Sequence, residues 1–263
     1  DRRHFAVTMA RFRIQATLAE NRLGLAWVVL SPLLQAAVYG LIFGLIMSSS
    51  TRPDPFIPFL VTGFFIFSYF GSCFGQGAKS ITSNRSLVRS LSFPRMLLPI
   101  SDVLRQIYEL IPMLAVLAVI VVAFGKPPTW NWLWVPPILV LMTMFNLGVA
   151  LIAARLTVHL RDVTQIIPII TRILFYATGL FYSLELVLQD KPQWIQTIAN
   201  LNPVYAFVTM VRHALLGPVI DPDTGEAVGS VEPLIITGVV SAVVFLVAGV
   251  IFFWKAEERY GRD

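Results

Sequence analysis

Two long uncharged runs dominate the first third of the chain. The first covers 29 residues from Leu23 to Thr51, and the second covers 24 residues from Pro55 to Ala78. A helix needs roughly 20 consecutive apolar residues to cross a hydrocarbon core about 30 Å thick. Since only the tripeptide Arg52-Pro53-Asp54 separates the two runs, the pattern predicts two successive membrane spans.

The long stretches without charged residues predict six membrane spans along the whole chain. Their expected bounds are residues 23–47, 56–78, 101–124, 130–154, 163–184 and 233–254. The third uncharged run, Leu110–Gly125, holds only 16 residues, so its helix is expected to begin near Ser101. Hydrophobic residues make up 56% of the 263 positions and charged residues only 13%, against about a quarter in soluble domains. These observations predict an all-α polytopic membrane protein that forms one domain over residues 1–263.

Lysine and arginine are distributed unevenly between the segments that connect the spans. If the N-terminus is inside, 15 of the 20 fall in inner segments, and one, Arg172, lies within the fifth span. The four outer ones are Arg52, Lys126, Lys191 and Arg212. Because cytoplasmic segments carry the excess of positive charge, both termini are predicted to be cytoplasmic. The net charge of +5 is then an orientation signal and does not indicate a nucleic-acid partner.

The first 22 residues precede the first span and have a pattern of their own. Phe5, Met9 and Phe12 recur at helical spacing, while Arg11 and Arg13 face elsewhere. This pattern predicts an amphipathic helix in the inner interface, and a solvated leader is the alternative.

The longest inner loop, residues 79–95, carries four basic residues and no acidic one. Ser83 and Asn84 are available as helix caps, and Phe93-Pro94 ends the segment. The loop is expected to form a short exposed helix that suits docking to another protein. The alternative is that its arginines fix the topology and contact anionic lipid. The candidate docking residues are Asn84, Arg85, Leu87, Val88, Arg89 and Leu91.

The outer segment 185–232 contains two short amphipathic stretches. The first has an apolar stripe made of Trp194, Ile195, Ile198 and Leu201. Asn202-Pro203 then interrupts the chain before the second stretch, residues 204–216. Both helices are expected to dip into the outer interface, with Trp194 and Tyr205 as anchors. Residues 218–232 predict a plain hairpin or loop, because their acidic spacing does not match a calcium-binding loop.

No catalytic constellation is found in the sequence. The three histidines are assigned to three different segments, and Cys73 is the only cysteine, so the usual metal patterns and an intrachain disulfide are excluded. The phosphate-binding loop G-x-x-x-x-G-K-[ST] is missing as well. A basic inner loop beside a bundle of spans without its own energy source suggests a separate motor subunit.

Arg172 lies about ten residues, or roughly 15 Å, along the fifth predicted span from Asp162. A charge near the middle of a membrane costs several kcal/mol unless it is paired or wet, so it is expected to face a cavity, a partner or a polar ligand. Phe175 and Tyr176 share its face of the helix. The functional interpretation is a contact for an anionic headgroup such as a lipid pyrophosphate. A salt bridge, or snorkelling of the side chain, is the alternative.

The second predicted span carries a phenylalanine stripe within a sector of roughly 80°. Its members are Phe56, Phe59, Phe67, Phe70 and Phe74. Aromatic rings can stack on the C–H faces of sugars and would offer a path without fixed hydrogen bonds. Such stripes equally suit helix packing or lipid contact, which is the alternative.

Four segments in register resemble one family. They are NRLGLAWVVLSPLLQ at residues 21–35, NRSLVRSLSFPRMLLPIS at 84–101, RDVTQIIPIITRILFYATGLFYS at 161–183 and LNPVYAFVTMVRHALLG at 201–217. Together they resemble the membrane subunit of ABC-2-type exporters, in particular those for polysaccharides, O-antigen, teichoic acid and cell-wall galactan. The resemblance extends over nearly the whole chain.

The resemblance implies a bacterial cytoplasmic-membrane permease that works with other subunits. Two copies of the chain would pair with two ATPase subunits, which bind ATP and Mg, and a lipid-linked glycan would thread between the copies. Residues 79–91 would hold the coupling helix, and residues 194–216 the outer gate helices. The gate residues would be Trp194, Ile198, Asn202, Pro203, Tyr205 and Arg212.

Three other functions remain open from the sequence. Drug or lipid exporters share the ABC-2 architecture. A polytopic polyprenyl-phosphate glycosyltransferase would need clustered acidic residues at an interface, and the outer acidic residues lie instead in a turn-rich loop. A secondary transporter would predict inverted repeats and carboxylates inside spans, and neither is evident. A neighbouring gene for an ATPase with a phosphate-binding loop would favour the exporter.

Overall fold

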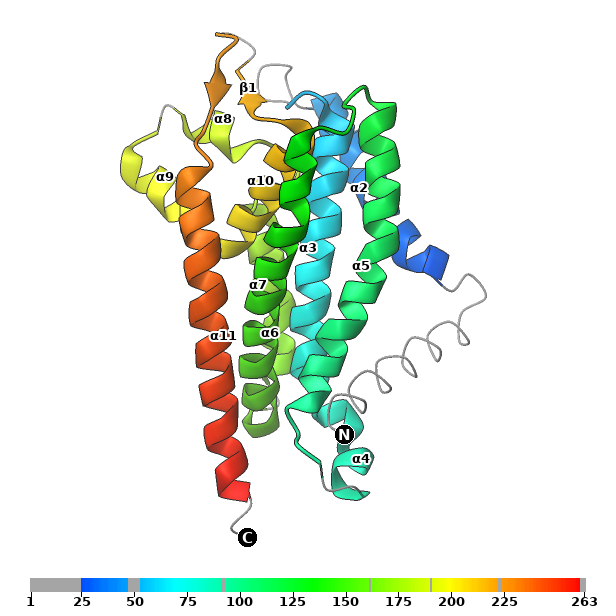
Figure 1. Cartoon of the computed structure of the whole chain (residues 1–263), viewed down its shortest axis with the longest axis vertical. Coiled ribbons are helices and arrows are strands. Elements are labelled where there is room, and N and C mark those ends of the chain that lie inside the picture. Colours follow the sequence, from blue (N-terminus) through cyan, green and yellow to red (C-terminus); the bar gives the residue numbers. More distant parts are fainter. Residues whose placement is uncertain are drawn as a thin grey trace.

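The computed structural model describes residues 25–46, 53–90, 93–160, 162–189, 191–221 and 224–260. These residues form a bundle of long helices with a two-stranded hairpin at one end (Figure 1). The elements are α2 (Leu25–Ile46), α3 (Phe56–Lys79), η1 (Thr82–Asn84), α4 (Arg85–Ser90), α5 (Leu97–Ala123), η2 (Trp130–Trp134), α6 (Val135–His159), α7 (Val163–Ala177), α8 (Leu184–Leu188), α9 (Gln193–Asn200), α10 (Pro203–Leu216), β1 (Val219–Ile220), β2 (Ala227–Val228) and α11 (Glu232–Tyr260).

The bundle has two distinct ends, which are named here by what they carry. Helix α4 lies at one end, called the α4 end, and the antiparallel β1–β2 hairpin lies at the other, called the hairpin end (Figure 1). Five of the described helices, α2, α3, α5, α6 and α11, are long and apolar enough to cross a membrane. The predicted all-α polytopic membrane fold is therefore confirmed. The predicted leader helix within residues 1–22 lies outside the described residues.

Helix α3 is the centre of the bundle. In its most apolar stretch 72% of the residues are buried, against 17% in α2 and 28% in both α5 and α11. Helices α2, α5, α6, α7 and α10 all pack against it. Its phenylalanines suit this position, because large aromatic side chains bury much area and fill the space between helices.

Helices α6 and α11 approach each other most closely through glycines. A Cβ added to Gly148 would collide with the backbone of Phe245 on α11, and one added to Gly249 would lie 2.6 Å from the Gly148 carbonyl oxygen. Small residues of this kind let helix backbones pack closely in a membrane.

Two span boundaries differ from those predicted from charge. Helix α5 begins at Leu97, not near Ser101, so Arg105 and Glu109 lie well inside the helix. They form an ion pair, with 2.8 Å between Arg105 Nε and Glu109 Oε1, and this pairing lets both charges occupy an apolar helix. Helix α6 continues to His159, past the predicted end at residue 154.

The fifth predicted span, residues 163–184, is wrong as a continuous helix. Helix α7 has only 15 residues and would rise about 22 Å, less than the roughly 30 Å of a hydrocarbon core. The helix ends before Gly179, whose φ of 61° lies in the left-handed region that glycine adopts without strain. The chain then turns and starts α8 at Leu184, with Ser183 accepting a hydrogen bond from the Leu186 N–H at 3.4 Å.

The second outer stretch also differs from the expectation. Helix α10 does not lie in an interface; it is buried in the bundle, where it packs against α3, α6 and α11. Its polar positions, which made the stretch read as amphipathic, have partners inside the protein: Arg212 bonds to backbone carbonyls and His213 to Glu185. Helix α9, by contrast, exposes Trp194 and Ile198, and Leu201 directly after it is exposed as well.

Candidate functional site

A groove of about 460 Å³ lies between α2, α3 and α7. Helix α7 lines it with Arg172, Phe175 and Tyr176, the three residues that were predicted to share one face of the fifth span. Helix α2 contributes Gln35 and Tyr39. The groove thus combines one cation, several rings and several hydroxyl and amide groups.

The wall of the groove on α3 is a stripe of small residues, which we call the small-residue stripe. Its members recur at helical spacing: Ser68, Gly71, Ser72 and Gly75. A Cβ at Gly71 would lie 3.5 Å from the Thr171 side chain, whereas one at Gly75 would meet nothing within 4 Å. The stripe therefore keeps the groove open, and it faces α7 across the groove. The sequence reasoning missed it, although the spacing of these small residues is visible in the sequence.

Arg172 is exposed in the groove and lies in the second half of α7. Within the described part of the chain its guanidinium has no hydrogen bond and no ion pair. The salt bridge that was the alternative to a functional role is thus not formed among these residues. A guanidinium in this setting is available to an anionic group, with which it can form charge-assisted bidentate hydrogen bonds.

A cluster of aromatic rings closes one end of the groove. Gly75 of the small-residue stripe lies toward the other end. Phe175 lies at its centre, with ring centroids 5.4 Å from Phe64, 5.4 Å from Phe67 and 5.5 Å from Tyr39. Tyr176 packs edge-on against Phe175 at 5.4 Å and is half exposed. These distances lie in the range of favourable aromatic pairs, so the cluster is a fixed wall and Tyr176 is its accessible edge.

The phenylalanine stripe on α3 does not form an open path. Phe59, Phe67 and Phe70 are all buried, and of the three only Phe67 also lines the groove. Phe74 stacks on Phe70 at 5.8 Å, and Phe56 lies beside Gly44 of α2. For the four rings other than Phe67 the structure shows helix packing, which was the alternative interpretation.

Arg212 is not at an open gate; it is a buried clamp with only 3% of its surface exposed. Its Nε donates to the Phe59 carbonyl at 3.1 Å, Nη1 to Gly179 at 3.0 Å and Nη2 to Leu180 at 2.9 Å. The guanidinium carbon also lies 3.5 Å from the centroid of the Phe59 ring. Arg212 therefore joins α10, the start of α3 and the turn after α7, and it satisfies two carbonyls of that turn.

The other predicted gate residues fall into two groups. Trp194 and Ile198 are exposed on α9, as an interfacial helix requires. Asn202 caps α10, since its Oδ1 accepts from the Val204 N–H at 3.1 Å, and Pro203 occupies the first helical position. Tyr205 is buried and is not an interfacial anchor.

The predicted docking loop forms η1 and the six-residue α4 at the α4 end (Figure 1). Arg85 is exposed, and Leu87 and Val88 are half-buried. Helix α4 also contains Arg89, whereas Leu91 lies outside the described residues. Ser83 and Asn84 do not cap α4: the Ser83 hydroxyl donates to the Lys79 carbonyl at 2.7 Å and the Asn84 amide to the Ser80 carbonyl at 2.6 Å. They close the end of α3 instead.

Comparison with known proteins identifies a matching family and several similar proteins. The family model for the ABC-2 type transporter matches residues 5–216. The O-antigen export system permease protein RfbA of Myxococcus xanthus is 28% identical over 261 residues, which cover 97% of this chain and 94% of that protein. Two proteins of the same name from Klebsiella pneumoniae are each 26% identical and cover 91% and 90% of this chain. The chain covers 87% and 86% of their lengths.

The family match covers four fifths of the chain and includes the groove, the Arg212 clamp and the α4 loop. It agrees with a bundle in which five described helices, α3 among them, are long and apolar enough to cross a membrane. The chain belongs to the ABC-2 type transporter family of membrane proteins.

Proposed function

We propose that this chain is the membrane subunit of an ATP-driven exporter that moves a lipid-linked polysaccharide from the cytoplasmic side outward. The observation that carries the proposal is the similarity to O-antigen export permeases along almost the full length of both chains. The groove supports it, because its lining suits both parts of such a cargo.

The anionic part of the cargo would be recognised by Arg172. A pyrophosphate that links a glycan to its lipid carrier is a dense negative charge, and a guanidinium without another partner is a suitable contact for it. The sugar part would meet Tyr176, Phe175 and the small-residue stripe. Aromatic rings pack against sugar C–H faces, while serine and glycine leave room for a chain to slide.

The second half of the path would come from a second copy of the chain. In one copy, the side of α7 next to the groove exposes Ile169, Arg172 and Ile173. Exposed apolar residues of this kind suit either lipid or another helix. Two copies that face each other here would enclose the cargo between two arginines and two aromatic walls.

Energy would come from two separate ATPase subunits, which bind ATP and Mg and dock at the α4 end. Most of the described lysines and arginines in connecting segments lie there, among them Lys79, Arg85 and Arg95, whereas Lys126 and Lys191 lie at the hairpin end. This distribution supports a cytoplasmic α4 end and two cytoplasmic termini in a bacterial inner membrane. Helix α4 would transmit the closure of the ATPases to α3, the helix that carries the small-residue stripe.

The test is co-expression of the chain with the ATPase encoded beside its gene. We expect the two proteins to purify together and a lipid-linked glycan to be found with them by mass spectrometry. Arg85→Glu with Arg89→Glu should abolish co-purification, because both changes place negative charge on α4. The matched control is Lys126→Glu with Lys191→Glu at the hairpin end, which should leave the complex intact.

Two outcomes would contradict the proposal in different ways. Unchanged co-purification of the α4 variant would reject α4 as the docking helix. A stable complex that carries a drug or a simple lipid, and whose ATP hydrolysis does not respond to lipid-linked glycans, would keep the exporter but reject the polysaccharide cargo.

A further inference from the structure

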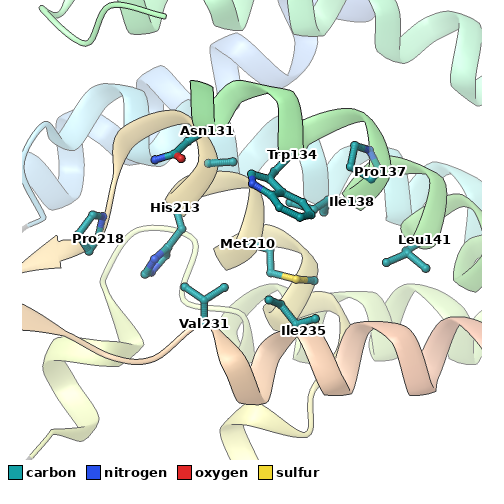
Figure 2. Close-up of a pocket in the computed structure, with 11 residues that line it drawn as sticks. Asn131, Trp134, Pro137, Ile138, Leu141, Met210, His213, Pro218, Val231 and Ile235 are labelled. Carbon is teal, nitrogen blue, oxygen red and sulfur yellow. The ribbon is translucent and has the colours of Figure 1, made fainter. Parts of the chain in front are cut away.

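A second cavity, of about 420 Å³, lies at the hairpin end between the start of α6, helix α10 and the start of α11 (Figure 2). It is separate from the groove beside Arg172 and shares no lining residue with it. Nine of its eleven lining residues are apolar: Trp134, Pro137, Ile138, Leu141, Met210, Ala214, Pro218, Val231 and Ile235. The two polar ones are Asn131 and His213.

The polar residues lie together at one end of this cavity. Figure 2 shows Asn131, His213 and Pro218 on one side and Leu141 on the other, with Trp134, Met210 and Ile235 between them. The His213 ring is held in the wall, because its Nε2 lies 2.9 Å from Glu185 Oε1 and the two side chains are only 9% and 6% exposed. The Asn131 side chain is exposed and makes no hydrogen bond within the described part of the chain. The cavity is thus apolar along its length with a hydrogen-bonding group at its end.

The wall of the cavity includes residues of the exposed apolar surface of the bundle. Trp134 and Ile235, which line it from α6 and α11, are 65% and 49% exposed. The same stretch of α11 exposes Ile236, Val239 and Val240, as a lipid-facing helix does. Trp134 lines the cavity, and Trp130 at the other end of η2 is 86% exposed. Tryptophan is enriched where acyl chains meet headgroups. The entrance is therefore placed near the headgroup level, with the apolar end deeper in the leaflet.

Hydrocarbon suits this space better than water does. Its volume is within the range of roughly 300–1,000 Å³ that is typical of ligand sites. Apolar cavities do not hold water well, because a water molecule needs two to four polar partners. An acyl chain in the bilayer is already out of contact with water. When it enters the cavity it therefore gains close packing contacts with the walls.

We infer that this cavity binds one acyl chain of a phospholipid from the leaflet around the hairpin end, with the Asn131 amide donating to an ester oxygen. The bound chain packs against Met210 and Ala214 of α10, the helix that carries Arg212. The inference depends on the membrane fold and not on the cargo or on the orientation proposed above.

Photo-crosslinking of the purified full chain tests the inference. The chain is reconstituted in nanodiscs of phosphatidylethanolamine and phosphatidylglycerol with a small fraction of a phospholipid that carries a diazirine near the end of one acyl chain. After irradiation, adducts are mapped by peptide mass spectrometry. We expect adducts at Met210 and Ile138, which are 3% and 9% exposed and which lipids on the outer surface of the bundle do not reach. Val244 on the lipid face of α11 is the internal reference.

Variants that fill the cavity make the test specific. Ala214→Leu occupies the space of about three carbons, so labelling at Met210 should fall roughly tenfold while labelling at Val244 is unchanged. Ile235→Trp, at the exposed entrance, should reduce labelling at Met210 in the same way. It replaces Ala214→Leu in the test if that variant does not fold. The matched control is Val239→Leu on the exposed face of α11, which should leave labelling at Met210 unchanged.

Three results would overturn the inference. The first is the lack of adducts at Met210 and Ile138 in the wild-type chain. The second is full labelling at Met210 in a folded Ala214→Leu or Ile235→Trp variant. The third is loss of that labelling on addition of a polyprenyl phosphate, but not of excess unlabelled phospholipid, which would assign the cavity to an isoprenoid chain.

Discussion

Arg172 and Arg212, two of the arginines among the apolar helices of this protein, have opposite surroundings. Arg212 is buried and donates hydrogen bonds to three backbone carbonyls from two distant parts of the chain. Arg172 is exposed in a groove and has no such partner within the described residues. Both cations are expensive to place in a membrane protein, so each needs a reason to be there.

The difference shows how structural and functional charges can be told apart. Arg212 is satisfied inside the fold, because three of its five N–H donors bond to backbone carbonyls and its guanidinium lies over the Phe59 ring. The donors of Arg172 are left for something that the chain itself does not supply. From the sequence Arg172 was a candidate for the substrate path and Arg212 for the outer gate, and only their partners in the structure distinguish a functional from a structural charge.

The largest effect is expected from removing the clamp with Arg212→Leu. The change leaves the buried carbonyls of Gly179 and Leu180 without their side-chain donor and removes one bond from the Phe59 carbonyl, so stability should fall by about 3–5 kcal/mol. The measurement is the melting temperature of the detergent-solubilised chain, followed by its loss from the monodisperse peak in size-exclusion chromatography.

Two variants serve as controls for the clamp. Arg212→Lys keeps one donor group that reaches fewer carbonyls, so its melting temperature should lie between those of wild type and Arg212→Leu. Arg172→Leu makes the same chemical change in the groove and should leave the melting temperature near that of wild type. Equal melting temperatures for Arg212→Leu and Arg172→Leu would remove the distinction between the two arginines.

A smaller loss is expected when the space around the clamp is filled. A Cβ at Gly63 would collide with the Arg212 guanidinium, so Gly63→Ala must displace the arginine or shift α3. Overpacking of this kind costs about 1–3 kcal/mol, and the melting temperature should fall accordingly. In the double variant with Arg212→Leu the alanine should cost much less, since the colliding group is gone. Additive losses in this cycle would show that Gly63 acts independently of the clamp.

The sequence predicted the membrane fold and the groove arginine but not the clamp. The five long spans follow from length and the lack of charge, which are local properties. Arg172, Phe175 and Tyr176 were placed together because residues three and four apart share a helix face. The partners of Arg212 lie 153, 33 and 32 residues away in the chain, and no local pattern indicates them. Where α7 ends was missed for the same reason, because residues 163–184 contain no second charge and the turn at Gly179 is stabilised from α10.

The third effect concerns transport and not stability. Arg172→Ala removes the guanidinium from the groove, so glycan-stimulated ATP hydrolysis of the complex with its ATPase should fall about tenfold, or 1.4 kcal/mol. Arg172→Lys keeps the charge but loses the bidentate geometry, so its glycan-stimulated ATP hydrolysis should fall less than that of Arg172→Ala. Basal ATP hydrolysis is the control, since it does not need the cargo. Stimulation equal to wild type in Arg172→Ala would leave the groove without its proposed anionic contact.

The smallest effect is expected at Gly75, the open position of the small-residue stripe. A Cβ there meets nothing within 4 Å, so Gly75→Ala should keep the fold and gain up to about 1 kcal/mol from helix propensity. It should also leave export unchanged, whereas Gly75→Phe should narrow the groove and slow export without lowering the melting temperature. Gly63→Ala and Gly75→Ala are the same substitution on the same helix, so their opposite effects on the melting temperature test the two regions directly. A loss of stability in Gly75→Ala as large as in Gly63→Ala would mean that the groove is packed in the assembled transporter, and that Arg172 has a protein partner there.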